Sequence, residues 1–221
     1  RGTRPYYFDE EHPEVVKKGH ENELRYFYHQ AHLPVREQDE AFGHSVRAVY
    51  LYSGMADVAR VDDDDALYEA CLKLWNNVTQ KKMYVTGGIG ATHLGEAFSF
   101  NYDLPNDTAY SETCAAIGLV FFARRMLEIK PDRSFSDVME RALYNTVLAG
   151  MAADGKSFFY VNPLEVYPKA CHEDARKFHV KPIRQKWFGC ACCPPNIARL
   201  LSSLAMYAYT ENEDTLFAHL F

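Results

Sequence analysis

The chain has 221 residues, of which 48% are hydrophobic and 24% charged, so it is long and apolar enough to fold around a sizeable core and is not disordered. Its formal net charge of −6 argues against nucleic acid or an anionic membrane as a partner, because both need clustered positive charge. No apolar run is long enough to cross a bilayer. These properties indicate a globular protein.

Hydrophobic periodicity predicts a mainly α chain. The helices are expected, in chain order, over residues 43–60, after the acidic run 62–65, over 108–129, over 136–151 and from Pro194 onward. The middle of the third helix is apolar nearly all round, which predicts burial on most sides. Residues 157–161 and 183–188 instead look extended. Long helices with a short β excursion favour an α/α toroid with its site in the loops at one end, although a plain helical bundle fits the same periodicity.

The spacing of the six cysteines does not indicate a set of disulfide bonds. Three of them lie within residues 190–193, and neighbouring cysteines such as Cys192 and Cys193 rarely bond each other because the ring is strained. This clustering is more typical of metal ligation in a reducing compartment. We therefore expect a cytoplasmic protein.

Cys192 and Cys193 stand directly before a predicted helix start, where the helix dipole and free N–H groups stabilise thiolates. Two adjacent thiolates repel each other unless a cation neutralises them, and Zn²⁺ is the natural partner. The alternative is a pair of reduced cysteines in the core. Glu112 and Cys114 form a second unusual pair, because on a regular helix their side chains would point in directions about 200° apart. They can meet one ion only in an irregular first turn, where the two pairs would supply three sulfurs and one oxygen.

A glycine-rich loop, residues 87–95, precedes Glu96. It has neither the lysine of a P-loop nor the spacing of a dinucleotide fingerprint, so it is better interpreted as a tight loop near a ligand. Ala97 and Phe98 follow Glu96, and apolar neighbours favour a protonated carboxyl, which suits a general acid. The alternative is a solvated surface glutamate.

Six short motifs occur in one order along the chain. They are Gly43-His44-Ser45-Val46-Arg47-Ala48, Gly87-Gly88-Ile89-Gly90, Gly95-Glu96-Ala97-Phe98, Tyr102-Asp103-Leu104-Pro105-Asn106-Asp107, Glu112-Thr113-Cys114 and Cys192-Cys193-Pro194-Pro195-Asn196. As an ordered set they resemble glycoside hydrolase family 127, the β-L-arabinofuranosidases, over about residues 25–210.

The resemblance implies part of an (α/α)6 barrel. Residues 1–221 would be a partial catalytic domain, without the N-terminal half of the barrel and the C-terminal β-sandwich domains. The terminal run 215–221, strand-like and ending without a turn, fits a fragment. Such a fragment is expected to pack against the missing half of the barrel or to self-associate.

The resemblance also implies a role for each matching residue. Cys192 would be the nucleophile and Glu96 the acid/base of a retaining hydrolase that releases L-arabinofuranose-type sugars from glycosides or oligosaccharides. Zn²⁺ would be held by Glu112, Cys114, Cys192 and Cys193. Substrate contacts would fall on His44 and Tyr160. Two alternatives remain: a zinc-stabilised carbohydrate-binding domain without catalysis, and a related hydrolase for another rare pentose.

Overall fold

The chain is mainly α-helical, as predicted, in a computed structural model that describes residues 23–190 and 192–221. The helices are α3 (Glu23–Tyr28), α4 (Ser45–Val61), α5 (Asp65–Lys81), α6 (Thr113–Ile129), α7 (Arg133–Ala142), α8 (Leu148–Gly150), α9 (Ala170–Glu173), α10 (Cys193–Ser202) and α11 (Ala205–Ala208). Short turns of 3-10 helix are η1 (Val35–Glu37), η2 (Leu94–Glu96) and η4 (Ala175–Lys177), and η3 (Leu143–Val147) is a π-helical turn. Strands β1 (Tyr209–Glu211) and β2 (Leu216–Ala218) pair in an antiparallel hairpin.

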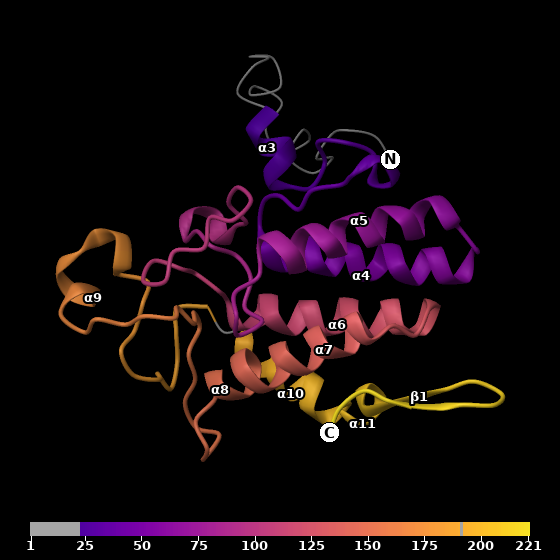
Figure 1. Cartoon of the computed structure of the whole chain (residues 1–221). Coiled ribbons are helices and arrows are strands. Elements are labelled where there is room, and N and C mark those ends of the chain that lie inside the picture. The colour runs from indigo at the N-terminus through magenta and orange to yellow at the C-terminus, as the bar shows by residue number, and fades with distance from the viewer. Residues whose placement is uncertain (1–22, 191) are drawn as a thin grey trace.

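The long helices run side by side, with α4 and α5 next to α6 and α7 (Figure 1). The two long connections, 82–112 and 151–192, lie at one end of these helices, on the left of Figure 1. The N-termini of α4, α6 and α10 open at that same end. Loops collected at one end of paired helices are what the α/α architecture predicts for its site.

Local sequence signals set several helix ends. The Asp64 side chain accepts a hydrogen bond of 2.9 Å from the Leu67 N–H and so caps α5, as expected for the acidic run. Asp132 caps α7 in the same way through the Ser134 N–H at 2.8 Å. Pro194 and Pro195 occupy the first turn of α10, where no backbone N–H is needed.

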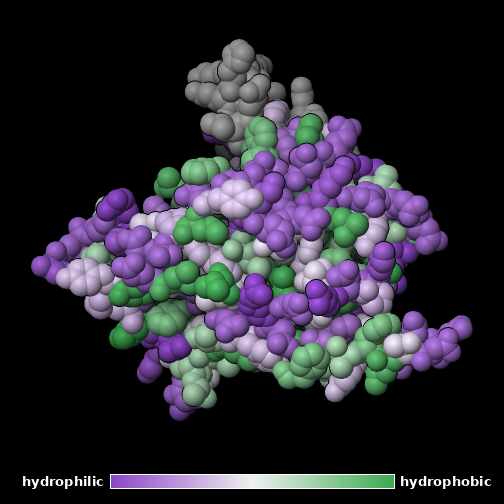
Figure 2. All heavy atoms as spheres, in the orientation of Figure 1, coloured by the Kyte–Doolittle hydropathy of each residue, from purple (hydrophilic) through white to green (hydrophobic). Residues whose placement is uncertain are grey.

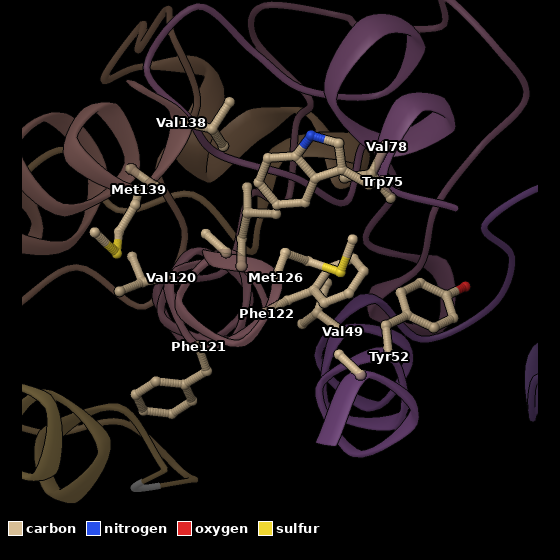
Figure 3. Packing of buried hydrophobic residues seen from close by; sticks show 14 of the residues in the cluster. Val49, Tyr52, Trp75, Val78, Val120, Phe121, Phe122, Met126, Val138 and Met139 are labelled. Atoms are coloured by element: carbon tan, nitrogen blue, oxygen red, sulfur yellow. The ribbon is translucent and has the colours of Figure 1, made fainter. Parts of the chain in front are cut away.

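Helix α6 lies at the centre of the core. Its apolar middle, residues 115–123, is buried throughout, which confirms the prediction. Figure 3 shows Trp75 of α5 beside Phe122 of α6, and their rings meet edge-to-face at 5.5 Å. Each large side chain buried in this way contributes about 1.5–3 kcal/mol. Gly118 lets α4 approach closely, because a Cβ there would lie 2.4 Å from Val49 Cγ2.

Two local predictions were wrong in detail. Helix α6 begins at Thr113 and not near Thr108, because the preceding backbone turns through Ser111 at φ +43° and bonds to the carbonyl of Gly90. The start of this helix was therefore predicted too early. The segments 157–161 and 183–188, predicted to be extended, pair through isolated antiparallel bridges such as Phe158 with Gln185 and form no regular strand. Both segments depend on partners distant in sequence, which periodicity does not reveal.

The surface mixes polar residues with scattered apolar patches, some of them along the lower edge of the face in Figure 2. Several large apolar side chains are strongly exposed, among them Ile183, Trp187 and Met206. Within the described residues no helix combines the length and apolar character needed to span a membrane.

Candidate active site

Three helix N-termini meet at the site. His44 is the N-cap of α4, Glu112 the N-cap of α6 and Cys192 the N-cap of α10. Glu112 has extended backbone angles and Cys114 lies in the first turn that follows, so the two side chains can face one point, as the sequence required. The positive ends of three helix dipoles therefore surround a group of anionic side chains.

The side chains of Glu112, Cys114, Cys192 and Cys193 converge into a compact cluster that could hold a metal ion. Cys114 Sγ lies 3.4 Å from Cys192 Sγ and 3.6 Å from Cys193 Sγ. Cys192 Sγ lies 3.8 Å from Cys193 Sγ and 3.3 Å from Glu112 Oε1. Sulfurs bound tetrahedrally to zinc at about 2.3 Å stand about 3.8 Å apart, so the donor set fits such an ion. The other carboxylate oxygen, Glu112 Oε2, is buried without a hydrogen-bond partner, which also fits a missing cation.

The cluster concentrates negative charge on Cys192. Hydrogen bonds from the Cys114 and Cys193 thiols hold the pKa of Cys192 far below its ordinary value. Burial and the neighbouring Cys192 sulfur raise the pKa of Glu112 to about 9. The pKa of Cys193 is raised by its contacts with Cys114 and Cys192 and by burial. These directions favour Cys192 as the group of the cluster that ionises most readily, and a bound cation would favour ionisation of the others as well.

Glu96 is held beside this cluster in an unusual backbone conformation. It follows Gly95 at φ +71° and itself has φ +55°, a region that non-glycine residues seldom adopt. Tyr110 Oη donates a hydrogen bond of 2.7 Å to Glu96 Oε1, and His44 Nε2 lies 3.1 Å from Glu96 Oε2. The sequence predicted apolar neighbours for the Glu96 carboxyl; Ala97 and Phe98 are buried, but the partners of the carboxyl in the structure are polar.

The other two partners of the site are His44 and Tyr160. Burial and then the charge of Arg47 lower the pKa of His44, so its imidazole is neutral near pH 7. Tyr160 Oη lies 3.0 Å from Cys192 Sγ. Burial and then this contact raise the pKa of Tyr160, so the hydroxyl keeps its proton and can donate to a thiolate.

An open pocket of about 520 Å³ lies over these residues. It is lined by His44, Val46, Tyr50, Glu96, Glu112, Cys114, Tyr160, Cys190, Cys192, Pro195, Asn196 and Arg199. Six of the seven site residues expected from the sequence line it, and the seventh, Cys193, is fully buried behind them. Cys192 is half-buried and lines the pocket, whereas Cys193 is buried and does not.

Sequence reasoning gave no role to several residues in or beside the pocket. Tyr110, two positions before Glu112, was assigned none, although its hydroxyl contacts Glu96. Asn196 Nδ2 donates a 2.7 Å bond to Tyr50 Oη, and Arg199 Nη2 donates a 2.6 Å bond to Asn196 Oδ1. The spacing of three between Asn196 and Arg199 on a helix could have signalled this pair. Ala191, the residue before Cys192, is outside the described residues.

Paired helices thus carry a cluster of thiols and a carboxyl in one open pocket, and comparison with known proteins shows the family to which a chain with this site belongs. The chain belongs to glycoside hydrolase family 127: the model of the family's β-L-arabinofuranosidase catalytic domain matches residues 7–206. This finding confirms the resemblance in the sequence motifs.

Relatives from several bacteria are similar to most of the chain. The non-reducing end β-L-arabinofuranosidase of Bifidobacterium longum subsp. longum is 46% identical over 196 residues, which are 88% of this chain and 30% of the relative. The crystal structure of a family 127 β-L-arabinofuranosidase from Geobacillus stearothermophilus T6 matches 100% of this chain and 35% of its own, at 57% identity and a TM-score of 0.91. A second family 127 β-arabinofuranosidase of known structure is 50% identical, with a TM-score of 0.81 over 88% of this chain and 29% of its own. The chain therefore spans about a third of the length of these relatives.

Proposed function

We propose that the protein containing this chain is a retaining glycoside hydrolase that releases L-arabinofuranose-type sugars from β-L-arabinofuranosides. The observation that supports this most is that Cys192 and Glu96 line one pocket, the first as a half-buried sulfur whose pKa is lowered by neighbouring thiols and the second as a carboxyl fixed by hydrogen bonds. The names of the relatives suggest the sugar, and the geometry supports the proposal of a nucleophile and an acid/base.

The first step of the proposed reaction forms a sugar–cysteine bond. The Cys192 thiolate attacks the anomeric carbon, a sulfur–carbon bond forms, and the glycosidic carbon–oxygen bond breaks. The leaving oxygen takes the electron pair of that bond together with the proton of the Glu96 carboxyl. Tyr160, 3.0 Å from Cys192 Sγ, orients the sulfur toward the pocket by its hydrogen bond.

The second step restores the enzyme. The Glu96 carboxylate removes a proton from water while the water oxygen attacks the anomeric carbon. The carbon–sulfur bond breaks and its electrons return to Cys192 as thiolate. Two displacements at one carbon restore the original configuration, which is why the proposed reaction is retaining.

Glu112, Cys114, Cys192 and Cys193 are the residues that would hold Zn²⁺, an ion that when bound neutralises the thiolates and makes the Cys192 sulfur a better leaving group in the second step. The sulfur–sulfur distances and the orphaned Glu112 Oε2 support this assignment. His44 and Tyr160, both on the pocket wall, are proposed to contact the sugar as well as the catalytic groups.

The alternatives make different use of the same residues. In a zinc-stabilised binding domain all four ligands would be closed around the metal, whereas the exposure of Cys192 to an open pocket beside Glu96 favours catalysis. A related hydrolase for another pentose would keep the cluster and differ in wall residues such as Tyr50, Asn196 and Arg199. A panel of pentofuranosides assayed with the full-length protein separates these readings.

Because the chain spans about a third of its relatives, we propose that it is part of an (α/α)6 barrel completed by residues outside it. The exposed apolar side chains Ile183, Trp187 and Met206 support this, since they would pack against that remainder. All six cysteines are free, which supports the expectation of a reducing compartment such as the cytoplasm.

The test of the proposed function is Glu96→Gln in the full-length protein. Glu96 is not among the four clustered groups, so the variant is expected to bind metal and fold like the wild type but to lose about 10²–10⁴-fold in turnover. Glu173→Gln, an exposed glutamate on α9, is the matched control and should keep full activity.

Cys192 is tested by trapping, because Cys192→Ser would remove a ligand and a nucleophile together. A furanose with an electrophile at its anomeric carbon is expected to label Cys192 and to spare Cys190 and Cys171, as mass spectrometry of a digest will show. Full activity of Glu96→Gln, or a label on another residue, would refute the mechanism.

A further inference from the structure

Two tyrosines hold the two reacting side chains of the site. Tyr110 Oη donates to Glu96 Oε1 at 2.7 Å, and Tyr160 Oη contacts Cys192 Sγ at 3.0 Å. Their rings pack edge-to-face with centroids 6.2 Å apart. Each hydroxyl therefore reaches a different reacting group from one aromatic pair.

Backbone hydrogen bonds also hold Tyr110 and Tyr160 next to each other. Glu112 and Val161 form an antiparallel bridge, and the Thr113 N–H donates to the Tyr160 carbonyl at 2.9 Å. On the other side of the bridge, the Asn162 N–H donates to the Tyr110 carbonyl at 3.3 Å. The separation of the two hydroxyls is thus set by a short, hydrogen-bonded crossing of two chain segments.

Two side chains contact the Glu96 carboxyl: Tyr110 Oη at Oε1 and His44 Nε2, which lies 3.1 Å from Oε2. The Glu96 side chain is 36% exposed, and its backbone lies in the left-handed region at φ +55°. The Tyr110 hydroxyl occupies Oε1 as a donor, so the acidic proton of a neutral Glu96 belongs on the other oxygen, Oε2. Without the bond from Tyr110, only the contact with His44 Nε2 would orient the carboxyl, and that contact can be made by either carboxylate oxygen.

On the basis of the proposed function, we infer that Tyr110 is a positioning residue for the general acid: its hydrogen bond to Glu96 Oε1 keeps Oε2 as the oxygen that delivers the proton to the leaving group. Tyr110 acts through Glu96 and does not itself transfer a proton. The predicted signature is a defect that depends on how strongly the leaving group needs protonation.

The experiment compares two substrates in the full-length protein. A methyl β-L-arabinofuranoside needs its leaving oxygen protonated, whereas 4-nitrophenolate departs without help. Tyr110→Phe is expected to lower kcat/KM for the methyl glycoside by about 10–100-fold, the effect of one hydrogen bond to the carboxylate charge that forms as Glu96 gives up its proton, and for the 4-nitrophenyl glycoside by less than about 3-fold. The parameter kcat/KM is used because it covers the steps up to departure of the leaving group.

Tyr84→Phe is the matched control. Tyr84 is also buried and donates one hydrogen bond, of 3.1 Å to the Pro105 carbonyl, but it does not line the pocket. Its loss is expected to leave the ratio of the two kcat/KM values unchanged. If Tyr110→Phe lowers kcat/KM equally for both substrates, the role of Tyr110 is structural only. If it lowers kcat/KM for neither, Glu96 needs no restraint from Tyr110. Either result overturns the inference.

Glu96→Gln on the same substrates separates this inference from the function on which it rests. If Glu96→Gln discriminates strongly between the two leaving groups and Tyr110→Phe does not, the acid is correct and the role of Tyr110 is wrong. If Glu96→Gln shows no dependence on the leaving group, both assignments are wrong.

Discussion

Replacement of Cys193 by serine tests the metal cluster without touching the pocket. Cys193 is fully buried, and its Sγ lies 3.6 Å from Cys114 Sγ and 3.8 Å from Cys192 Sγ. A serine hydroxyl is a shorter and far weaker zinc ligand than a thiolate. Structural zinc sites bind with about 10–16 kcal/mol, or roughly 2.5–4 kcal/mol for each of four ligands. Cys193→Ser should therefore weaken zinc binding by about 10²–10³-fold.

The assay is competition between the protein and a chromogenic chelator of known zinc affinity, with total zinc per chain measured by mass spectrometry. One zinc per chain is expected for the wild type. Cys190→Ser is the control for the pocket, since Cys190 is exposed and lies outside the four clustered groups. Cys71→Ser is the control for a buried thiol, because Cys71 lies in the helical core and burial raises its pKa to about 12. Wild-type zinc affinity in Cys193→Ser, or its loss in Cys190→Ser, would refute the assignment of these ligands.

Two further predictions concern stability. Gly118→Ala should destabilise the domain by about 1–3 kcal/mol, because the new Cβ would lie 2.4 Å from Val49 Cγ2. Gly54→Ala on α4, where the new Cβ would have nothing within 4 Å, should stabilise the domain by up to about 1 kcal/mol. Denaturation midpoints that rank the two variants the other way would contradict this packing. Burial and the stacked His93 lower the pKa of His179 in the folded state below 6.5. The unfolded chain therefore binds more protons at this residue. The free energy of unfolding is expected to fall as the pH drops from about 6.5 through the lower pKa of the folded state. His179→Phe should flatten that acid limb in denaturant titrations at several pH values, and an unchanged slope would show that His179 does not contribute.

Sequence patterns predicted those parts of the fold that depend on neighbours along the chain. Asp64 as a cap and Pro194 in a first turn are local signals, and both mark helix starts in the structure. The buried middle of α6 follows from its composition alone. The start of α6 was placed too early because Ser111 takes a positive φ that is supported by Gly90, a residue outside any local window.

The site could be predicted as a set of residues but not as a geometry. Chemistry and resemblance together indicated that Cys114 and Cys192 share an ion, and the structure brings these sulfurs to 3.4 Å across 78 positions of sequence. The contact between Tyr110 and Glu96 had no such signal, since a tyrosine 14 positions from a glutamate is ordinary. Tyr110 is placed by the crossing of residues 110–113 with 160–162 and by the bond of its N–H to the Ala91 carbonyl, all of them contacts between segments distant in sequence. The roles of these residues stay predictions until the variants are measured.

The π-helical turn η3 has a consequence for how the chain tolerates insertions and deletions. A π turn holds one residue more than an α turn needs, so loss of any one of its residues would let the helix continue with regular geometry. The same loss would rotate everything beyond it by about 100°, which is one residue of an α-helix. Thr146 Oγ1 would leave the Thr86 carbonyl, now 2.8 Å away, and the Gly150 carbonyl would no longer face the Phe159 N–H at 2.8 Å. A shortened helix would be the more regular one and yet would lose the bonds that join it to the loops around the site.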